Sequence, residues 1–281
     1  SLDLFVRDGE IRGMKQSVLS VIGLLAVTAL LWSSDGTIQP YRHSDLFTDE
    51  EVISSDPMEV KGLDPVMAHL LKAYYEKSFG GAENWEQVQS LFIRGQVVNS
   101  NGDNFEFINL RKKPDLNKLV VYVGKEHHII SCYNGVEAWQ HQTFEGDKAK
   151  PMLVNVAVDF IRDSWFGGHL LYPMLPGKRI ERVGFAMVEA EMCTLVKVTL
   201  PNGQYYTISL DSNRYERAEE TVRAVDGSKR YSIQSDFQRL SGVILPFKSQ
   251  IFQDDVLMQE IIIDSVVFNK GVMPWMFNRP E

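Results

Sequence analysis

The chain has 281 residues, and its composition excludes several classes of protein. Hydrophobic residues make up 44% of it and aromatic residues 11%, which excludes disorder for most of the chain and supports a sizeable buried core. The formal net charge is −8, whereas a protein that binds nucleic acid needs a basic surface against the phosphates. We therefore expect one large globular domain with no nucleic-acid partner.

The first segment, residues 1–34, has the pattern of an export signal. Met14 and Lys15 precede an apolar run over residues 18–32. This run is shorter than the roughly 20 residues that a comfortable membrane span needs, but it suits the apolar region of a signal peptide. An uncleaved anchor and a buried core helix are the two alternatives. We expect an exported protein in the periplasm, either released or held at the inner membrane.

An acidic linker over residues 35–62 separates this segment from a domain that we place at 63–281. No apolar period survives in the linker, so it is interpreted as a solvated tether. Asp64 and Pro65 then open a helix that Gly80 and Gly81 end. Its expected apolar stripe consists of Val66, Met67, Leu70, Leu71 and Tyr74. A short second helical stretch over residues 82–89 leads into the first strand.

Residues 91–268 alternate between apolar and polar side chains in short runs, which predicts about ten β-strands. The pairs Asn101-Gly102, Asn202-Gly203 and Asp226-Gly227 indicate hairpins, because both residues of such a pair accept positive φ in a type I′ turn. Consecutive hairpins build an antiparallel sheet. The fold class is therefore mainly β, with a few helices (α+β).

One long amphipathic helix, predicted over residues 151–172, interrupts the strands. Its polar face, expected to meet solvent, carries Asn155, Asp159, Arg162 and Asp163. A sheet must bury its apolar face against something, and this is the long amphipathic helix available among the strands. We predict a curved antiparallel sheet folded over the helix. Either the helix fills the enclosed space or it leaves an apolar cavity there.

The remaining reactive side chains show no pattern of a catalytic or metal site. Cys132 and Cys193 lie on separate predicted strands, and we interpret them as buried thiols, with a disulfide as the alternative. His127 and His128 are adjacent on a strand and so point to opposite faces. The sequence has no Gly-x-Ser-x-Gly elbow, phosphate-binding loop or dinucleotide fingerprint. We expect a protein that is not an enzyme and needs no cofactor or metal.

Several segments, in their order and spacing, resemble bacterial outer-membrane lipoprotein-sorting proteins, the broad group of LolA-like and LolB-like lipoprotein carriers. These segments are residues 80–85 (GGAENW), 111–116 (RKKPDL), 133–139 (YNGVEAW), 236–247 and 263–266, with Phe277 and Pro280 near the end. The resemblance covers residues 63–281. It implies an incomplete β-barrel with helices over its open side and an apolar cavity that receives acyl chains of lipoproteins or related lipids. It also implies a role for Lys113, which stands where the carriers have an arginine that helps control cargo retention.

We therefore expect a monomer that binds a lipid or an acylated protein without catalysis. Besides Lys113, the expected ligand-binding residues lie on the middle helix and on the inward side of an early strand: Leu153, Val156, Ala157, Phe160, Leu119, Val121 and Val123. The alternative is an envelope-anchored sensor or protein-interaction domain that uses the same fold to bind envelope proteins.

Overall fold

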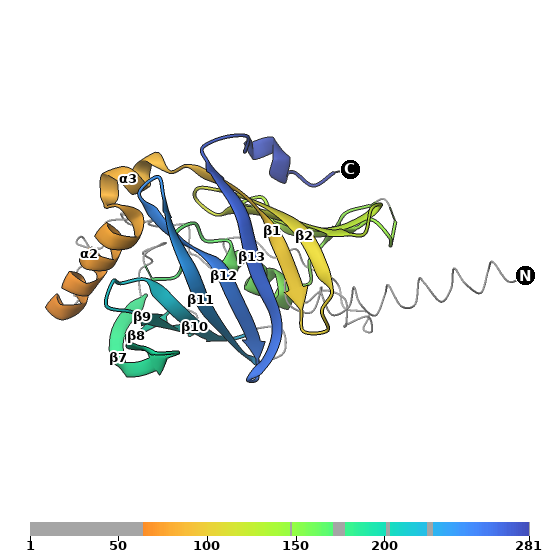
Figure 1. Ribbon diagram of the computed structural model, residues 1–281. Helices are drawn as coiled ribbons and strands as arrows, with labels where there is room; N and C mark the ends of the chain where they lie inside the picture. Colours follow the sequence, from red (N-terminus) through yellow and green to blue (C-terminus); the bar gives the residue numbers. More distant parts are fainter. Residues whose placement is uncertain (1–63, 147, 171–177, 201–202, 224–226, 281) are drawn as a thin grey trace, which may run out of the picture.

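The computed structural model describes residues 64–146, 148–170, 178–200, 203–223 and 227–280. The predicted signal segment and the predicted linker lie outside these ranges. The described residues form a single sheet of thirteen antiparallel strands with few helices (Figure 1). The predicted mainly β fold is confirmed, and the sheet has more strands than the ten or so that the alternation indicated.

The helices are α2 (Pro65–Phe79), α3 (Ala82–Gln87), α4 (Val154–Asp163) and the 3-10 helix η3 (Pro274–Phe277). The strands are β1 (Ser90–Asn99), β2 (Asn104–Lys112), β3 (Leu116–Val123), β4 (His127–Tyr133), β5 (Ala138–Gln142), β6 (Lys150–Pro151), β7 (Arg179–Val188), β8 (Glu191–Thr199), β9 (Tyr205–Leu210), β10 (Glu216–Val222), β11 (Lys229–Leu240), β12 (Val243–Gln253) and β13 (Val256–Phe268). Among the helices of the described ranges, none combines the length and the apolar character needed to cross a membrane.

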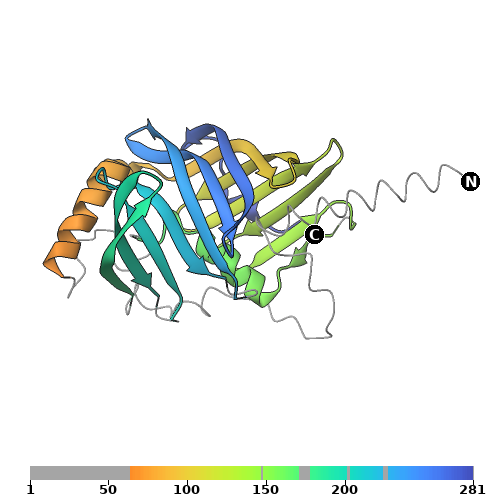
Figure 2. The same cartoon turned by 60° about the horizontal axis from the view of Figure 1, so that its bottom comes forward.

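The order of the strands explains why α4 lies inside the curve of the sheet. The order is β6-β5-β4-β3-β2-β1-β13-β12-β11-β10-β9-β8-β7. A first meander, β1–β6, and a second meander, β7–β13, join where β1 pairs with β13. Strands β6 and β7 follow each other in the sequence but form opposite edges of the open sheet. The chain between them must cross from edge to edge, and α4 is part of that crossing. Figure 2 shows the curvature of the sheet.

Helix α2 forms where the sequence predicts it and packs on the concave face of the second meander. Pro65 occupies its first turn, and Gly80 ends it in the left-handed conformation with φ 75°. It contacts β7 and β12 and joins the largest apolar core of the protein. Met67, Leu70, Leu71 and Tyr74 are buried as expected. Val66 is wrong as a core residue, because it lies in the first turn and remains 54% exposed.

Helix α4 is shorter than the predicted span of 151–172. At its start, Pro151 pairs with Trp139 as the last residue of β6 instead of entering the helix. The helix ends at Asp163, and the Ser164 hydroxyl then donates a hydrogen bond of 2.7 Å to the Phe160 carbonyl oxygen. Gly167, with φ 106°, turns the chain away from helical geometry. The last predicted residue, Tyr172, lies outside the described ranges.

The Asn101-Gly102 pair makes the predicted hairpin but not the predicted type I′ turn. Gly102 has positive φ (89°), whereas Asn101 is not among the residues with positive φ. The Asn101 side chain instead hydrogen-bonds to Asp103, accepting from its backbone N–H at 3.1 Å and donating to its carboxylate at 2.8 Å. This local side-chain bonding favours a longer loop over the two-residue turn. Asn202 and Asp226, of the other two pairs, lie outside the described ranges.

The C-terminal segment covers the convex face of the first meander. The Phe277 carbonyl oxygen accepts hydrogen bonds from the Trp139 indole N–H at 3.0 Å and from the Cys132 thiol at 3.3 Å. Trp139 and Phe277 are fully buried there. Cys132 and Cys193 are both buried and free, so the interpretation as two thiols is confirmed.

Candidate ligand-binding site

The concave face of the first meander carries a row of side chains from β2 at two-residue spacing. Phe107, Asn109 and Arg111 all point to this face, because alternate residues of a strand share a side of the sheet. The Asn109 amide donates a hydrogen bond of 2.6 Å to the Asn117 side chain on the neighbouring strand β3. The row therefore changes from aromatic to polar and ends in a guanidinium group.

Arg111 joins the sheet to the end of α4. Its Nη2 donates hydrogen bonds to the carbonyl oxygens of Asp163 at 2.9 Å and Trp165 at 2.8 Å. Helices leave their last carbonyl groups without partners inside the helix, so a guanidinium is well suited to this place. Its Nε is buried without a hydrogen-bond partner. Burial lowers the pKa of Arg111, and Asp163 partly offsets that effect.

The polar face of α4 meets the interior only in part, because Arg162 is buried there whereas Asp163 is exposed as predicted. Arg162 is only 2% exposed and pairs with Asp159 one turn earlier. The Asp163 carboxylate accepts a hydrogen bond of 2.7 Å from Arg230 on β11. Burial acts to raise the pKa of Asp163, but the Arg230 guanidinium holds it below its usual value. The prediction of a solvated face is therefore wrong for Arg162, because the polar face lies over the second meander.

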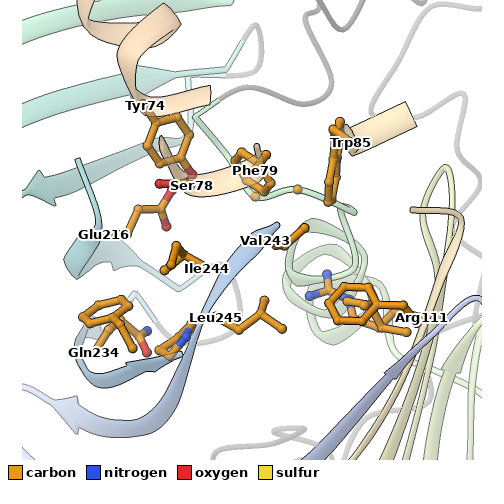
Figure 3. A pocket seen from close by; sticks show the side chains of 16 residues that line it. Tyr74, Ser78, Phe79, Trp85, Arg111, Glu216, Gln234, Val243, Ile244 and Leu245 are labelled. Carbon is orange, nitrogen blue, oxygen red and sulfur yellow. Dashed lines mark hydrogen bonds between the residues drawn. The ribbon is translucent and has the colours of Figure 1, made fainter. Parts of the chain in front are cut away.

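Two cavities lie on the concave side, and Arg111 lines both of them. The α2 cavity, of about 190 Å³, lies between the C-terminal end of α2 and strands β11 and β12. Figure 3 shows Tyr74 and Glu216 at one side of it and Arg111 at the other, with Val243 and Leu245 between them. The Tyr74 hydroxyl donates a hydrogen bond to Glu216, and burial raises the pKa of that carboxyl group.

The α4 cavity, of about 200 Å³, lies between α4 and strands β1–β3, β11 and β13. Its apolar walls consist of Ile93, Phe107, Leu119, Phe160, Ile261 and Ile263. Its polar side consists of Asn109, Arg111, Asn117, Asp163 and Arg230. The arrangement suits an amphiphilic molecule, with a long apolar wall and charged groups gathered along one side.

Lys113 lies at the turn between β2 and β3, beside the α2 cavity. Its ammonium group stands 4.4 Å from the centroid of the Trp85 ring and donates a hydrogen bond to the Trp85 carbonyl oxygen. The Phe166 ring centroid is 5.8 Å away. Burial lowers the pKa of Lys113 to about 8. Phe166 N–H also bonds to the Pro114 carbonyl at 3.4 Å, so this turn holds the segment that follows α4.

A second buried group of titratable side chains lies beyond α4, on the second meander. His169 stacks on Tyr206, with ring centroids 3.7 Å apart, and its Nε2 lies 3.9 Å from Glu219 Oε2. Burial lowers the pKa of His169 to about 3 and raises the pKa of Glu219 to about 8. Both groups are therefore mainly neutral near pH 7. In the described part of the chain, no three His, Cys, Asp or Glu side chains gather as metal ligands.

The structure brings only some of the predicted site residues to these cavities. Phe160 and Leu119 line the α4 cavity, and Val121 packs in the same apolar cluster as Leu119. Val123 belongs to a separate small cluster with Ile129. The other three predicted residues of the middle helix pack toward β4 and β5 beside Tyr133, Ala138 and Met152: these are Leu153, Val156 and Ala157.

Sequence reasoning missed Arg111, Asp163 and Arg230 as a group. Asp163 was placed on the solvent side of its helix, where it is exposed, but Arg111 and Arg230 stand on strands far apart in the sequence. One signal was available for Arg111. It follows Phe107 and Asn109 at two-residue spacing, so an inward Phe107 places Arg111 on the same face.

Comparisons with known proteins identify the fold. No family model and no curated protein matches this chain. Among solved structures, it is similar to a LolA superfamily protein from Nitrosomonas europaea, with 11% identity, a TM-score of 0.51, and 75% of this chain and 96% of that one covered. It is also similar to a DUF1329 family protein from Desulfovibrio piger, with 9% identity, a TM-score of 0.54, and coverages of 77% and 98%. The chain has a LolA-like fold, and at such identities the likeness shows the fold alone.

Proposed function

We propose that this chain is an exported envelope protein that binds a lipid, or the acyl part of a lipoprotein, on its concave face without catalysis. One observation carries the proposal: two cavities with largely apolar walls lie between the curved sheet and its helices, on either side of Arg111. Each methylene group moved from water to such a wall contributes about 0.8 kcal/mol, so an acyl chain supplies ample driving force. The LolA-like fold and the apolar N-terminal run support the same role.

The turn at Lys113 is part of this proposal. The turn and Arg111 together hold the chain that follows α4, through the bonds to Asp163, Trp165 and Phe166. These contacts use main-chain carbonyl and N–H groups, so they do not depend on the side chains of that segment. We assign to this turn the retention of the bound ligand beneath α4.

Binding of a fluorescent fatty-acid probe tests the proposal. The purified protein should bind the probe saturably, and Phe160→Asp should weaken binding at least tenfold, because it places a carboxylate in the apolar wall of the α4 cavity. Val154→Asp is the matched control, since Val154 is on the same helix but 45% exposed. Absence of saturation at tens of micromolar probe contradicts lipid binding.

A second candidate function is a sensor or protein-interaction domain. The observation that favours it is a group of exposed apolar side chains on the edge strand β7 and its neighbour β8: Val183, Phe185, Met187 and Met192, each more than half exposed. An unpaired edge strand with apolar side chains is a typical surface for protein contacts. This candidate predicts that the probe does not saturate the protein, so the same titration separates the two functions.

A further inference from the structure

Arg111 stands at the boundary of the two cavities, and its charge is incompletely matched. It lines both the α2 cavity and the α4 cavity. The partners of its Nη2 are two neutral main-chain carbonyl groups, and its buried Nε has none. A guanidinium remains charged in proteins, so this half-buried one carries a positive charge at the wall of both cavities.

The other charged groups that line the α4 cavity do not neutralise the positive charge of Arg111. Arg230 and Asp163 face each other at 2.7 Å and neutralise each other. Arg111 contacts the main-chain carbonyl of Asp163 and not its carboxylate. The α4 cavity has two guanidinium groups, one carboxylate and the neutral amides of Asn109 and Asn117 among its polar lining. The balance of the cavity is one positive charge, which a ligand with one negative charge would complete.

The volumes limit the size of the ligand. Each cavity holds about 200 Å³ or slightly less, below the range of about 300–1,000 Å³ that drug-sized ligands occupy. The several acyl chains of a fully lipidated protein terminus exceed this space. One unbranched chain matches it better, with its apolar length against Phe107, Leu119 and Phe160.

We propose that the concave site takes a single-chain amphiphile with one anionic headgroup, of the fatty-acid class, whose carboxylate binds between Arg111 and Arg230. This inference rests on the proposed lipid-binding function and adds to it the charge and the number of chains of the ligand. The Arg111 and Arg230 guanidinium groups supply the N–H donors, and the walls of the α4 cavity supply the apolar contacts.

Competition between matched ligands tests the headgroup. The full chain is loaded with an uncharged apolar dye, N-phenyl-naphthylamine, which is then displaced by dodecanoate, by its methyl ester or by dodecylamine. Dodecanoate should displace the dye at a concentration roughly ten- to a hundredfold lower than the ester does, as expected for a charge-assisted hydrogen bond. The protonated amine should displace it least.

Variants then locate the headgroup. Arg230→Gln and Arg111→Gln should each reduce the ratio of dodecanoate affinity to ester affinity about tenfold, whereas Asp163→Asn should increase it, because the ligand no longer competes with a protein carboxylate. Arg94→Gln is the matched control, since Arg94 is an exposed arginine beside Ile93 on β1. Each ratio is measured within one variant whose fold is verified by circular dichroism, so a loss of stability alone does not change it.

The outcomes separate this inference from the proposed function. Equal displacement by dodecanoate and its ester in the unmodified protein overturns the anionic headgroup while leaving lipid binding in place. A preference for dodecanoate that persists in both arginine variants overturns its location. A protein that binds neither the dye nor any of the three amphiphiles overturns the proposed function, and the inference with it.

Discussion

Helices α2 and α4 both cover the concave face of one sheet, but they do so with different chemistry. α2 contributes Met67, Leu71 and Tyr74 to a single continuous apolar core shared with strands β7–β9. α4 packs a small apolar face on β4 and β5, buries the Arg162 guanidinium against Asp159, and pairs the more exposed Asp163 with Arg230. The comparison shows that the largest apolar core lies under α2, whereas charged side chains and the polar lining of a cavity are gathered around α4.

The largest effect is expected where a charge on α4 loses its partner. Asp159→Asn should lower the free energy of unfolding by about 3–5 kcal/mol, because it leaves the buried Arg162 guanidinium without its carboxylate. Replacing both partners, in the double variant Asp159→Leu/Arg162→Met, should cost far less, because no buried charge is left unpaired. Urea denaturation of both variants measures the difference. Equal costs would show that the pair is not a buried charge system, and the contrast between the helices would fail.

The corresponding change under α2 removes apolar volume. Leu71 is fully buried in the large core, so Leu71→Ala should lower the free energy of unfolding by about 2–5 kcal/mol. The affinity for a fatty-acid probe should not change in the folded fraction, since Leu71 is not among the residues that line either cavity. Chemical denaturation and probe titration of the same variant measure both. A selective loss of probe binding would place the ligand under α2 instead.

The smallest expected effect depends on pH and concerns the second meander beside α4. Burial, aided by Glu216, raises the pKa of Glu219 to about 8, so the folded protein holds a proton there that the unfolded chain releases near its ordinary value of 4.5. This carboxyl group therefore makes stability fall as pH rises from 4.5 to 8. As pH rises across that interval, the free energy of unfolding of Glu219→Gln should increase by about 1–3 kcal/mol relative to that of the unmodified protein.

The quantity to measure is the difference in free energy of unfolding between Glu219→Gln and the unmodified protein, by denaturation at several pH values. His169 changes stability in the opposite direction, because burial lowers its pKa to about 3 and its contribution rises with pH up to about 6.5. Since His169 is present in both proteins, its contribution cancels to first order in the difference. A difference that does not vary with pH would mean that Glu219 is ionised in the fold.

The sequence predicted most helices and strands correctly, but it did not predict which parts of the protein the two faces of α4 contact. The period of α2 correctly marked Leu70, Leu71 and Tyr74 as buried, because the apolar stripe of a surface helix packs against the core. For α4, periodicity separated an apolar face from a polar one, but it carries no information on what lies opposite. The polar partner Arg230 comes from a strand 67 residues further along the chain.

Strand patterns fail for a similar reason at the candidate site. Alternation shows that Phe107, Asn109 and Arg111 share a side, yet one side of β2 faces α4 across the α4 cavity and the other is covered by the C-terminal segment. Only the curvature of the whole sheet decides which side encloses a cavity. Lys113 was expected near the ligand from the resemblance, and the structure lines both cavities with the guanidinium two residues earlier, at Arg111.

The route of the chain from β6 to β7 links the shape of the sheet to the occupancy of its interior. Because these consecutive strands are the two free edges, α4 belongs to a covalent strap that spans the mouth. A guest beneath α4 lies under a connection that is anchored at both free edges of the sheet, so a substitution at either edge acts on the same segment as the guest.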